Sequence, residues 1–442
     1  MSARGLIIAA PASGSGKTIF TLGLLRALQS RAIPLASAKV GPDYIDPAFH
    51  AAAGRGSCLN LDSWAMRNAT IARAVASLSE RAELIITEGV MGLFDGADLP
   101  EGGPCGSTAD LAAMTGWPVL LLVDLKGQAA SAAALVDGFR RYRPDVPLAG
   151  VLFNRLGSAA HRAMVERAMA QCCPELPILG WLPRHAALAL PERHLGLVQA
   201  LETPELEARM DEAAAIVERH VDLDRLIALA RPGLMAPAGG PDWPIPPLGQ
   251  CIAIARDEAF AFCYAGLLAG WQQAGASLSF FSPLADQAPP ASADAIYLPG
   301  GYPELQAGRL ASASCFLEGL RRAAAGGAWI YGECGGYMTL GQGLEDAQGV
   351  RHGMAGLLPL VTSFAKRRLQ LGYRQVEQAD TSPLGPLRAR FRGHEFHYAT
   401  ITEEGAGAPL FQAEDAAGRS LGGMGRRRDR VMGSFVHLVD RV

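Results

Sequence analysis

A single cysteine stands among glycines in the stretch YGECGG, residues 331–336, directly after a short apolar run. Glycines at positions 332, 335 and 336 permit a strained turn from a strand into a helix, which is typical of a nucleophile. In this interpretation the N–H group of Gly335 stabilises an oxyanion, and the helix N-terminus favours the Cys334 thiolate. The alternative is that Cys334 is a small residue packed in a tight turn.

A thiol that attacks an amide needs a base, and His437 in the stretch GSFVHLVD is the candidate. The stretch YLPGGYPE follows another apolar run, and its Gly300 and Gly301 offer a second backbone donor near the same edge of a sheet. The alternative for His437 is a packed histidine near the end of the chain.

A second group of candidate residues lies in PASGSGKT, residues 11–18, which follows the first apolar run. It resembles the phosphate-binding pattern GxxxxGK[ST], although Pro11 replaces the first glycine. Backbone N–H groups here can converge on phosphate oxygens at a helix N-terminus. The alternative is a Gly/Ser turn with a solvated lysine. The predicted ATP-binding residues of this loop are Ser13, Gly14, Ser15, Gly16, Lys17 and Thr18.

Charged side chains follow further predicted strands, in AKVGPDYIDP and LIITEGVMGLFDG. Ligands of open parallel sheets bind where the strands end, and Mg²⁺ uses few protein carboxylates. Each acidic residue taken singly could instead cap a turn or face solvent. We expect Lys39 to bind ATP, Thr18, Asp43 and Glu88 to bind Mg²⁺, and Asp46 and Asp95 to activate the substrate. Asn154 ends another strand, where it either reads an adenine edge or belongs to a turn.

The elements that must position these residues are visible as short, continuously apolar runs separated by helix-like segments. This pattern predicts parallel strands buried on both faces and joined in βαβ units. The segment ALARPGLMAPAGGPDWPIPPLG is too rich in Pro and Gly for a helix or a central strand. We therefore expect an α/β fold of two doubly wound domains, residues 1–225 and 250–442, joined by a linker at 226–249. Expected strands lie at 6–10, 84–87, 119–123, 148–153, 251–255, 278–281, 295–298 and 328–331, with a helix at 258–275.

Composition excludes several classes of protein. The chain has 442 residues, 49% of them hydrophobic, and a net charge of -3, so no basic field recruits nucleic acid. No apolar run is long enough to cross a membrane, and the first apolar run does not resemble a signal peptide. None of the eight cysteines forms a CxxC pair, which argues against structural zinc. We expect reduced thiols in a cytoplasmic protein.

The motifs together resemble a known family over nearly the whole chain. PGGYPE, GECGGYMTLG and FVHLVD resemble the class I glutamine amidotransferase domain, in the branch found in cobyrinic acid synthases. Most class I domains carry a Glu two residues after the histidine; Val439 stands there, which leaves open what orients His437. SGSGKT, KVGPDYIDP and TEGVMGLFDG resemble the dethiobiotin-synthetase-like ATP domain of the same enzymes. The GPDYID loop favours the cobyrinate or hydrogenobyrinate a,c-diamide synthases over the larger cobyric acid synthases.

The resemblance implies a P-loop NTPase-like domain followed by a flavodoxin-like amidotransferase domain. It also implies ATP, Mg²⁺ and L-glutamine as cofactor and co-substrates, and a corrinoid tetrapyrrole acid amidated at its a and c acetates through acyl phosphates. A homodimer, the cobalt content of the substrate, the order of amidation and the route of ammonia stay open. Two alternatives remain: an amidase acting on a nickel or iron tetrapyrrole, and a P-loop switch ATPase with a degenerate amidotransferase module.

Overall fold

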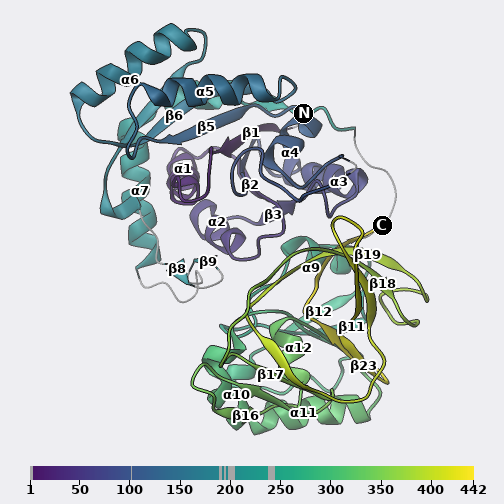
Figure 1. Ribbon diagram of the computed structural model, residues 1–442. Coiled ribbons are helices and arrows are strands. Elements are labelled where there is room, and N and C mark those ends of the chain that lie inside the picture. Colours follow the sequence, from purple (N-terminus) through teal and green to yellow (C-terminus); the bar gives the residue numbers. More distant parts are fainter. Residues whose placement is uncertain (1–2, 101, 189–191, 194–195, 198–204, 237–243) are drawn as a thin grey trace. The chain divides into compact units, whose positions relative to one another are not determined.

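The computed structural model describes residues 3–100, 102–188, 192–193, 196–197, 205–236 and 244–442. They group into two compact units (Figure 1). The first unit comprises Met1–Trp64, Asn68–Ala97 and Glu101–Gly239; the second comprises Ala65–Arg67, Asp98–Pro100 and Gly240–Val442. No helix in the described part of the chain is long and apolar enough to cross a bilayer.

The first unit is built on a parallel sheet of strand order β3-β2-β4-β1-β5-β6-β7. The apolar runs form its buried strands, as expected, because side chains on both faces of such a sheet are covered. The predicted linker begins inside helix α8 (Leu223–Leu229) and includes β10 (Arg231–Pro232), which pairs antiparallel with β1. The strands are β1 (Arg4–Ala9), β2 (Leu35–Val40), β3 (Cys58–Leu61), β4 (Leu84–Glu88), β5 (Val119–Asp124), β6 (Leu148–Leu156) and β7 (Ile178–Pro183).

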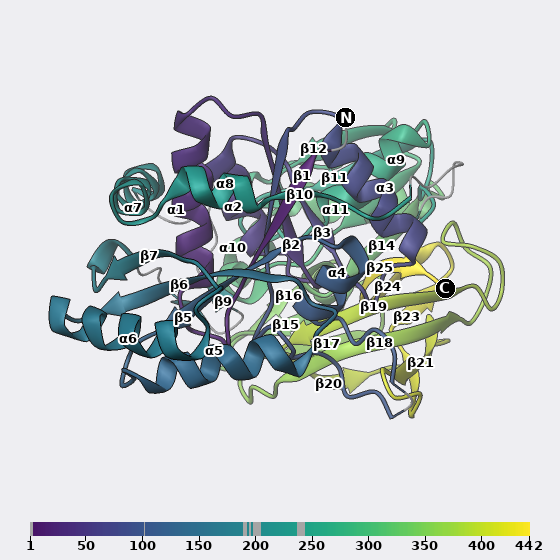
Figure 2. The same cartoon turned by 90° about the horizontal axis from the view of Figure 1, so that it is seen from above.

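Helices cover both faces of this sheet. Figures 1 and 2 show α5 (Ser131–Tyr142) and α6 (Ala159–Cys172) on one side, with α1 (Lys17–Ser30) and α7 (Leu206–His220) on the other. This arrangement is the doubly wound fold expected from the sequence. The remaining elements are α2 (Asp46–Gly54), α3 (Asn68–Ser79), α4 (Thr108–Thr115), a 3-10 turn (Ala186–Leu188) and the short pair β8 (Glu192–Arg193) and β9 (Gly196–Leu197).

The second unit contains a parallel sheet of order β12-β11-β13-β14-β24, with β23 antiparallel at one edge. Helix α9 begins at Ala265, not within 258–264 as predicted, because Phe262 forms a bridge to Gly300 there. The strands are β11 (Cys251–Ala255), β12 (Ser277–Phe281), β13 (Ala295–Leu298), β14 (Trp329–Glu333), β23 (Arg426–Arg428) and β24 (Val431–Ser434). The helices are α9 (Ala265–Gln273), α10 (Ala307–Ser312), α11 (Ser314–Ala325) and α12 (Gly335–Leu340), with 3-10 turns at Pro283–Ala285 and Pro303–Gln306.

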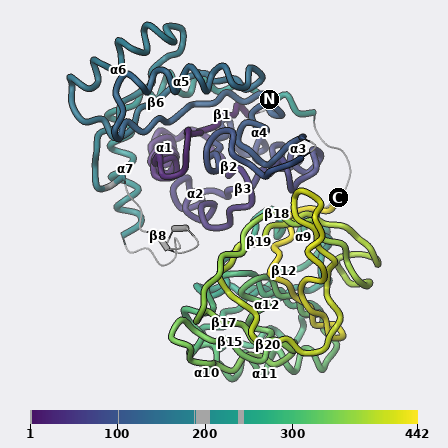
Figure 3. The backbone as a smooth tube through the Cα atoms, in the orientation of Figure 1, coloured from purple at the N-terminus to yellow at the C-terminus, as the bar shows by residue number. Residues whose placement is uncertain are grey.

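A largely antiparallel region follows α12, and the sequence analysis did not predict it. The chain leaves the parallel sheet after α12 and returns to it only at β23 and β24 (Figure 3). Strand β25 then pairs with β19, and His437 is the first residue of β25. These strands are β15 (Gly343–Glu345), β16 (Arg351–Gly353), β17 (Leu360–Ser363), β18 (Gln370–Gln378), β19 (Arg390–His397), β20 (Thr400–Glu404), β21 (Phe411–Asp415), β22 (Ser420–Met424) and β25 (His437–Arg441).

Candidate active sites

The P-loop of the first unit joins β1 to α1. Gly14 and Gly16 have φ angles of 74° and 94°, which favour glycine. A Cβ atom at Gly16 would lie 2.5 Å from Asn154 Nδ2, so the loop also needs glycine for space. Ser15 Oγ donates to Ala12 O at 2.8 Å, while Ser13 is exposed. The loop therefore holds a defined shape at the N-terminus of α1, where phosphate binds well.

The side chain of Asn154 stabilises the P-loop through a hydrogen bond to its backbone. Its Nδ2 donates to Ser15 O at 2.9 Å, and its Oδ1 accepts the N–H of Arg155. Because the buried amide is bonded to the P-loop backbone, the structure gives Asn154 a supporting position next to the phosphate site. Contact with an adenine stays a prediction.

Lys17 and Thr18 open α1 and reach toward the neighbouring strand end. Lys17 Nζ donates to Met91 O at 2.6 Å, and Thr18 Oγ1 donates to Glu88 Oε1 at 2.7 Å. Burial, reinforced by the charge of Lys39, lowers the pKa of Lys17 to about 8. The β1–β4 pairing brings Ile8 opposite Glu88, so the P-loop and Glu88 start from adjacent strand ends.

Glu88 is the centre of a buried charged cluster. Lys39 Nζ donates to Glu88 Oε1 at 2.7 Å and to Asp46 Oδ2 at 2.6 Å, and His50 Nε2 lies 2.7 Å from Glu88 Oε2. Burial opposes ionisation of Glu88, but Lys39 and His50 outweigh it and hold the pKa of Glu88 well below its ordinary range. Burial and then Asp43 raise the pKa of Asp46 to about 7.

His50 belongs to this cluster although the sequence analysis did not single it out. It lies in α2, in the run DPAFH, where nothing in the spacing marks it as chemical. Burial opposes its ionisation, but Cys58 and Glu88 outweigh burial and raise the pKa of His50 to about 10. Only the fold shows that its ring meets Glu88.

Asp43 and Asp95 shape the loops beside the cluster. Asp43 Oδ1 accepts the N–H groups of Ile45 and Asp46 at 2.8 and 3.0 Å. Asp95 Oδ2 accepts the N–H of Gly92 at 2.9 Å. The structure thus assigns each a turn-stabilising bond, and their predicted roles in metal binding and substrate activation remain predictions.

The side chains around Glu88 include groups of the kind that bind Mg²⁺. Within the described ranges there is no group of three or more His, Cys, Asp or Glu side chains arranged to hold a metal ion. Thr18 Oγ1 and Glu88 Oε1 lie together at 2.7 Å, and Lys39 donates to the same Glu88 oxygen. A hydroxyl and a carboxylate fit Mg²⁺, which binds few protein ligands and completes its shell with phosphate and water.

The nucleophile candidate of the second unit lies at the end of β14. Cys334 has φ 46° and ψ -103°, a strained conformation for a residue other than glycine, directly before α12. Its side chain is buried, with 1% exposed, rather than exposed as expected from the turn. Burial, followed by the charge of Glu304, raises the pKa of the thiol, and the Gly335 N–H only partly opposes them. The resting side chain is thus a thiol and not the thiolate that the helix N-terminus suggested.

His437 and the two glycine turns meet at this cysteine. A Cβ atom at Gly300 would lie 2.9 Å from His437 Nε2 and 3.3 Å from Cys334 Cβ, so both side chains border one small space. A Cβ atom at Gly335 would lie 3.0 Å from Gly301 N, which brings two backbone donors together. Burial lowers the pKa of His437 to about 3, so the imidazole is neutral and can accept a proton.

Glu333 is a buried carboxylate at this site that the sequence analysis did not single out. Its oxygens accept hydrogen bonds from Tyr297 Oη at 2.6 Å, Tyr331 Oη at 2.9 Å and Leu438 N at 3.1 Å. The Oε2 atom also lies 3.6 Å from His437 Nδ1. One feature of the sequence could have identified Glu333, because it is a charged residue inside an otherwise apolar run. A charged side chain in a buried strand needs partners.

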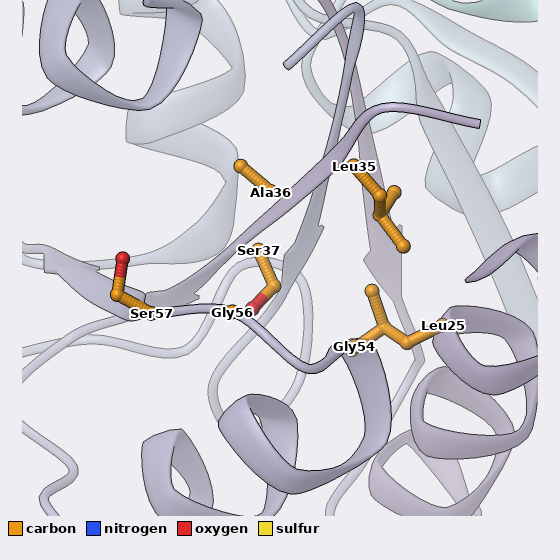
Figure 4. Close-up of a pocket in the computed structure, with 7 residues that line it drawn as sticks. All are labelled: Leu25, Leu35, Ala36, Ser37, Gly54, Gly56 and Ser57. Atoms are coloured by element: carbon orange, nitrogen blue, oxygen red, sulfur yellow. The ribbon is translucent and has the colours of Figure 1, made fainter. Parts of the chain in front are cut away.

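Two cavities lie apart from these residues. A cavity of about 10 Å³, enough for one water, is lined in the first unit by Leu25, Leu35, Ala36, Ser37, Gly54, Gly56 and Ser57 (Figure 4). No charged side chain lines it. A hollow of about 760 Å³ in the second unit is bordered by Asp294 and Trp329, where β13 and β14 begin, whereas Cys334 follows the other end of β14.

Each of the two units matches a known protein family. Residues 6–198 match the CobQ/CobB/MinD/ParA nucleotide binding domain, and residues 251–440 match the CobB/CobQ-like glutamine amidotransferase domain. The chain is thus a nucleotide-binding P-loop domain joined to a glutamine amidotransferase domain, the composition of an amidating ligase that uses glutamine.

Similar proteins identify the family within this class. The chain is 54% identical to the hydrogenobyrinate a,c-diamide synthase of Brucella anthropi, over 99% of this chain and 98% of that one. It is 53% identical to the enzyme of the same name from Rhizobium meliloti, over 99% of each chain. The chain belongs to the hydrogenobyrinate a,c-diamide synthase family. The MinD cell division protein of Aquifex aeolicus covers 51% of this chain at 14% identity, but its TM-score of 0.30 adds nothing to the assignment.

Proposed function

We propose that this chain converts the a and c acetate carboxylates of hydrogenobyrinic or cobyrinic acid into primary amides, as a step of cobalamin biosynthesis. The observation that carries the proposal is the identity of more than half the residues with hydrogenobyrinate a,c-diamide synthases, over 99% of the chain. ATP and L-glutamine are the proposed co-substrates, with the nitrogen of each new amide taken from glutamine.

The first unit activates the carboxylate in this proposal. A carboxylate is a poor electrophile, so transfer of the γ-phosphoryl group of ATP makes it a reactive acyl phosphate and releases ADP. The charges of Lys17 and Lys39 stabilise the transferred group, since phosphoryl transfer depends mainly on positioning and electrostatics. Mg²⁺ bound to Thr18 and Glu88 would supply further positive charge to the phosphate oxygens. Asp46 and Asp95 are proposed to position the substrate carboxylate.

The second unit supplies ammonia. Cys334 Sγ attacks the side-chain carbonyl carbon of glutamine while His437 Nε2 takes the thiol proton. The N–H groups of Gly301 and Gly335 donate to the oxygen that becomes negative. His437 then returns the proton to the departing nitrogen, which leaves as ammonia. Water hydrolyses the remaining thioester to glutamate and the free thiol.

Ammonia attacks the acyl phosphate, and an amide and inorganic phosphate are formed. Two such rounds use two molecules of ATP and two of glutamine. The close proximity of Cys334 and His437 at Gly300 supports the glutamine half of this cycle, and the cluster around Glu88 supports the other half.

An amidation assay read by mass spectrometry tests the proposal. The protein is incubated with MgATP, glutamine and either hydrogenobyrinic acid or cobyrinic acid. We expect two successive replacements of a carboxyl OH by NH2 on at least one of them, and the faster substrate shows whether cobalt is already present. Hydrolysis of glutamine with no amide formed on either acid would reject the corrinoid substrate and point to a nickel or iron tetrapyrrole.

A further inference from the structure

The base of the glutaminase reaction needs a fixed orientation. An imidazole accepts the thiol proton at Nε2 only when its own proton is on Nδ1, and an acceptor beside Nδ1 fixes that tautomer. Val439 occupies the position two residues after His437, and Asp440, the acidic residue of the same strand, is bound to Arg67. The acceptor must come from another element of the second unit.

We propose that Glu333, the residue before the nucleophile, is the carboxylate that orients His437. This inference rests on the proposed glutaminase function of Cys334 and His437. Glu333 Oε2 lies 3.6 Å from His437 Nδ1, and both side chains are 1% exposed. The carboxylate also balances the positive charge that His437 gains when it takes the thiol proton.

The two nitrogens of the ring face different partners. A Cβ atom at Gly300 would lie 2.9 Å from Nε2, in the space that also borders Cys334 Cβ. Nδ1 is the atom beside Glu333. The imidazole thus lies between the nucleophile and the carboxylate, as a base and its orienting group require.

Glu333 also holds the backbone that carries the histidine. Its Oε1 accepts the N–H of Leu438 at 3.1 Å, so β25 is anchored one residue beyond the ring. The hydroxyls of Tyr297 and Tyr331 donate to the carboxylate at 2.6 and 2.9 Å and fix its own position. In its ionised form, above its pKa of about 7, a carboxylate held by three donors is a rigid acceptor, and it presents an acceptor rather than a donor to Nδ1.

Glu333→Gln separates orientation from packing. The amide oxygen of glutamine can still accept from Leu438 N, while its NH2 group would donate toward His437 Nδ1 and favour the tautomer with the proton on Nε2. That tautomer cannot accept the thiol proton. Replacement of the orienting carboxylate by an amide in a catalytic triad lowers kcat by about 10⁴-fold, and we expect a loss of at least ~10²-fold. The KM for glutamine should stay within about threefold, because Glu333 orients the base and is not proposed to touch the substrate.

Glutamine hydrolysis is measured in the full-length protein with MgATP and the corrinoid acid present, alongside amide synthesis from ammonium chloride. The ammonia-dependent rate should match wild type, which shows that the first unit of Glu333→Gln is intact, and an unchanged KM for glutamine shows that the second unit is folded. Tyr331→Phe is the matched control: it removes one donor to Glu333 but leaves the acceptor beside Nδ1, and it should lose less than about tenfold in kcat. Glu333→Asp keeps a carboxylate and should retain more activity than Glu333→Gln.

Nitrogen-15 spectra of histidine-labelled protein give a readout that a packing role would not change. His437 should carry its proton on Nδ1 in wild type and on Nε2 in Glu333→Gln. Wild-type protein with the proton on Nε2 would overturn the inference even if the variant failed to fold, and so would undiminished hydrolysis by Glu333→Gln. If Cys334→Ala still hydrolyses glutamine, the proposed function fails instead, since that assignment does not depend on Glu333.

Discussion

Cys334 combines a strained backbone with a side chain that water does not reach. The thiol has no solvent to receive its proton, and His437 is the adjacent residue that we propose as its base. In the proposed mechanism, proton transfer to His437 accompanies attack on the substrate, in contrast to enzymes whose cysteine rests as a thiolate.

The substitution Cys334→Ala tests the proposed role of the thiol as nucleophile. We expect amide synthesis with glutamine to fall below detection, while synthesis with ammonium chloride stays close to wild type, because the alanine removes only the nucleophile. Both rates are read from the mass of the product. Ser312→Ala, at an exposed position on α10, is the control and should leave both rates unchanged. An equal loss with both nitrogen donors would contradict separate sites for ammonia release and carboxylate activation.

Glu333 gives a prediction about stability. Burial raises its pKa from an ordinary 4.5 to about 7, despite hydrogen bonds from Tyr297, Leu438 and Tyr331. Between these pH values the folded protein holds a proton that the unfolded chain has lost, so stability falls as pH rises from 4.5 through 7. The other ionisable groups facing it are Cys263, Cys334 and His437.

The glutamine of the Glu333→Gln variant has no carboxyl group and does not titrate in this range. From pH 4.5 to 8 its free energy of unfolding should therefore rise relative to wild type, by an amount on the order of 3 kcal/mol. Urea unfolding of the second unit at several pH values measures the difference. Glu318→Gln, at an exposed position of α11, should show no such trend, and parallel curves for wild type and Glu333→Gln would contradict the raised pKa.

At the scale of the element, the turn after β13 has two glycines with different tasks. A Cβ atom at Gly300 would press on His437 Cε1 at 2.5 Å, whereas a Cβ atom at Gly301 would overlap the backbone carbonyl of Ala259. A side-chain ring can rotate away, but a packed backbone cannot move cheaply.

We therefore expect Gly300→Ala to fold and to lose at least ~10²-fold in glutamine hydrolysis, because the imidazole is displaced by an ångström or less from its working position. Gly301→Ala should instead lower the melting temperature, with an overpacking cost of about 1–3 kcal/mol. Thermal unfolding and glutaminase rates of both variants separate the two effects. A normal glutaminase rate in Gly300→Ala would show that the Cys334–His437 geometry is not needed.

The elements that sequence predicted well are the buried parallel strands. Short apolar runs such as the one that forms β5 have few other interpretations in a chain with βαβ spacing. The segment 258–264 was predicted as the start of a helix, but the tertiary pairing of Phe262 with Gly300 prevents a helix there. Strand β19 pairs with β18, which directly precedes it, and with β25, which lies much later in the chain. Local patterns could not define the pairing with β25.

The two sites differ in what the sequence could predict. Cys334 and the P-loop carry local motifs, since glycines must stand beside the reactive group. His50 and Glu333 carry none, because each acquires its role from a partner on another element: Glu88 for His50 and His437 for Glu333. Residues that act through such partners become visible only in three dimensions.

At the scale of the whole molecule, the division of labour between the two units predicts separable defects. Glu88→Gln removes the negative charge of the carboxylate that Thr18, Lys39 and His50 all contact. The first unit should therefore lose carboxylate activation. We expect amide synthesis to fall at least ~10²-fold with either nitrogen donor, in keeping with the weight of electrostatics in phosphoryl transfer.

Glutamine hydrolysis by Glu88→Gln should persist, because Cys334 and His437 belong to the second unit. Measurement of glutamate and of amidated product from the same reaction tests this. The control is Glu80→Gln, at an exposed position after α3, which should behave as wild type. Full amide synthesis by Glu88→Gln would remove Glu88 from the activating site.

The burial of Cys334 also determines how this thiol responds to oxidants and alkylating reagents. Oxidants and alkylating reagents act on thiolates that they can reach, and Cys334 offers neither access nor charge at rest. Cys172 and Cys315 are exposed. Peroxide or maleimide should react with these two side chains first, and fluorescent dyes can be attached to them while Cys334 stays unmodified.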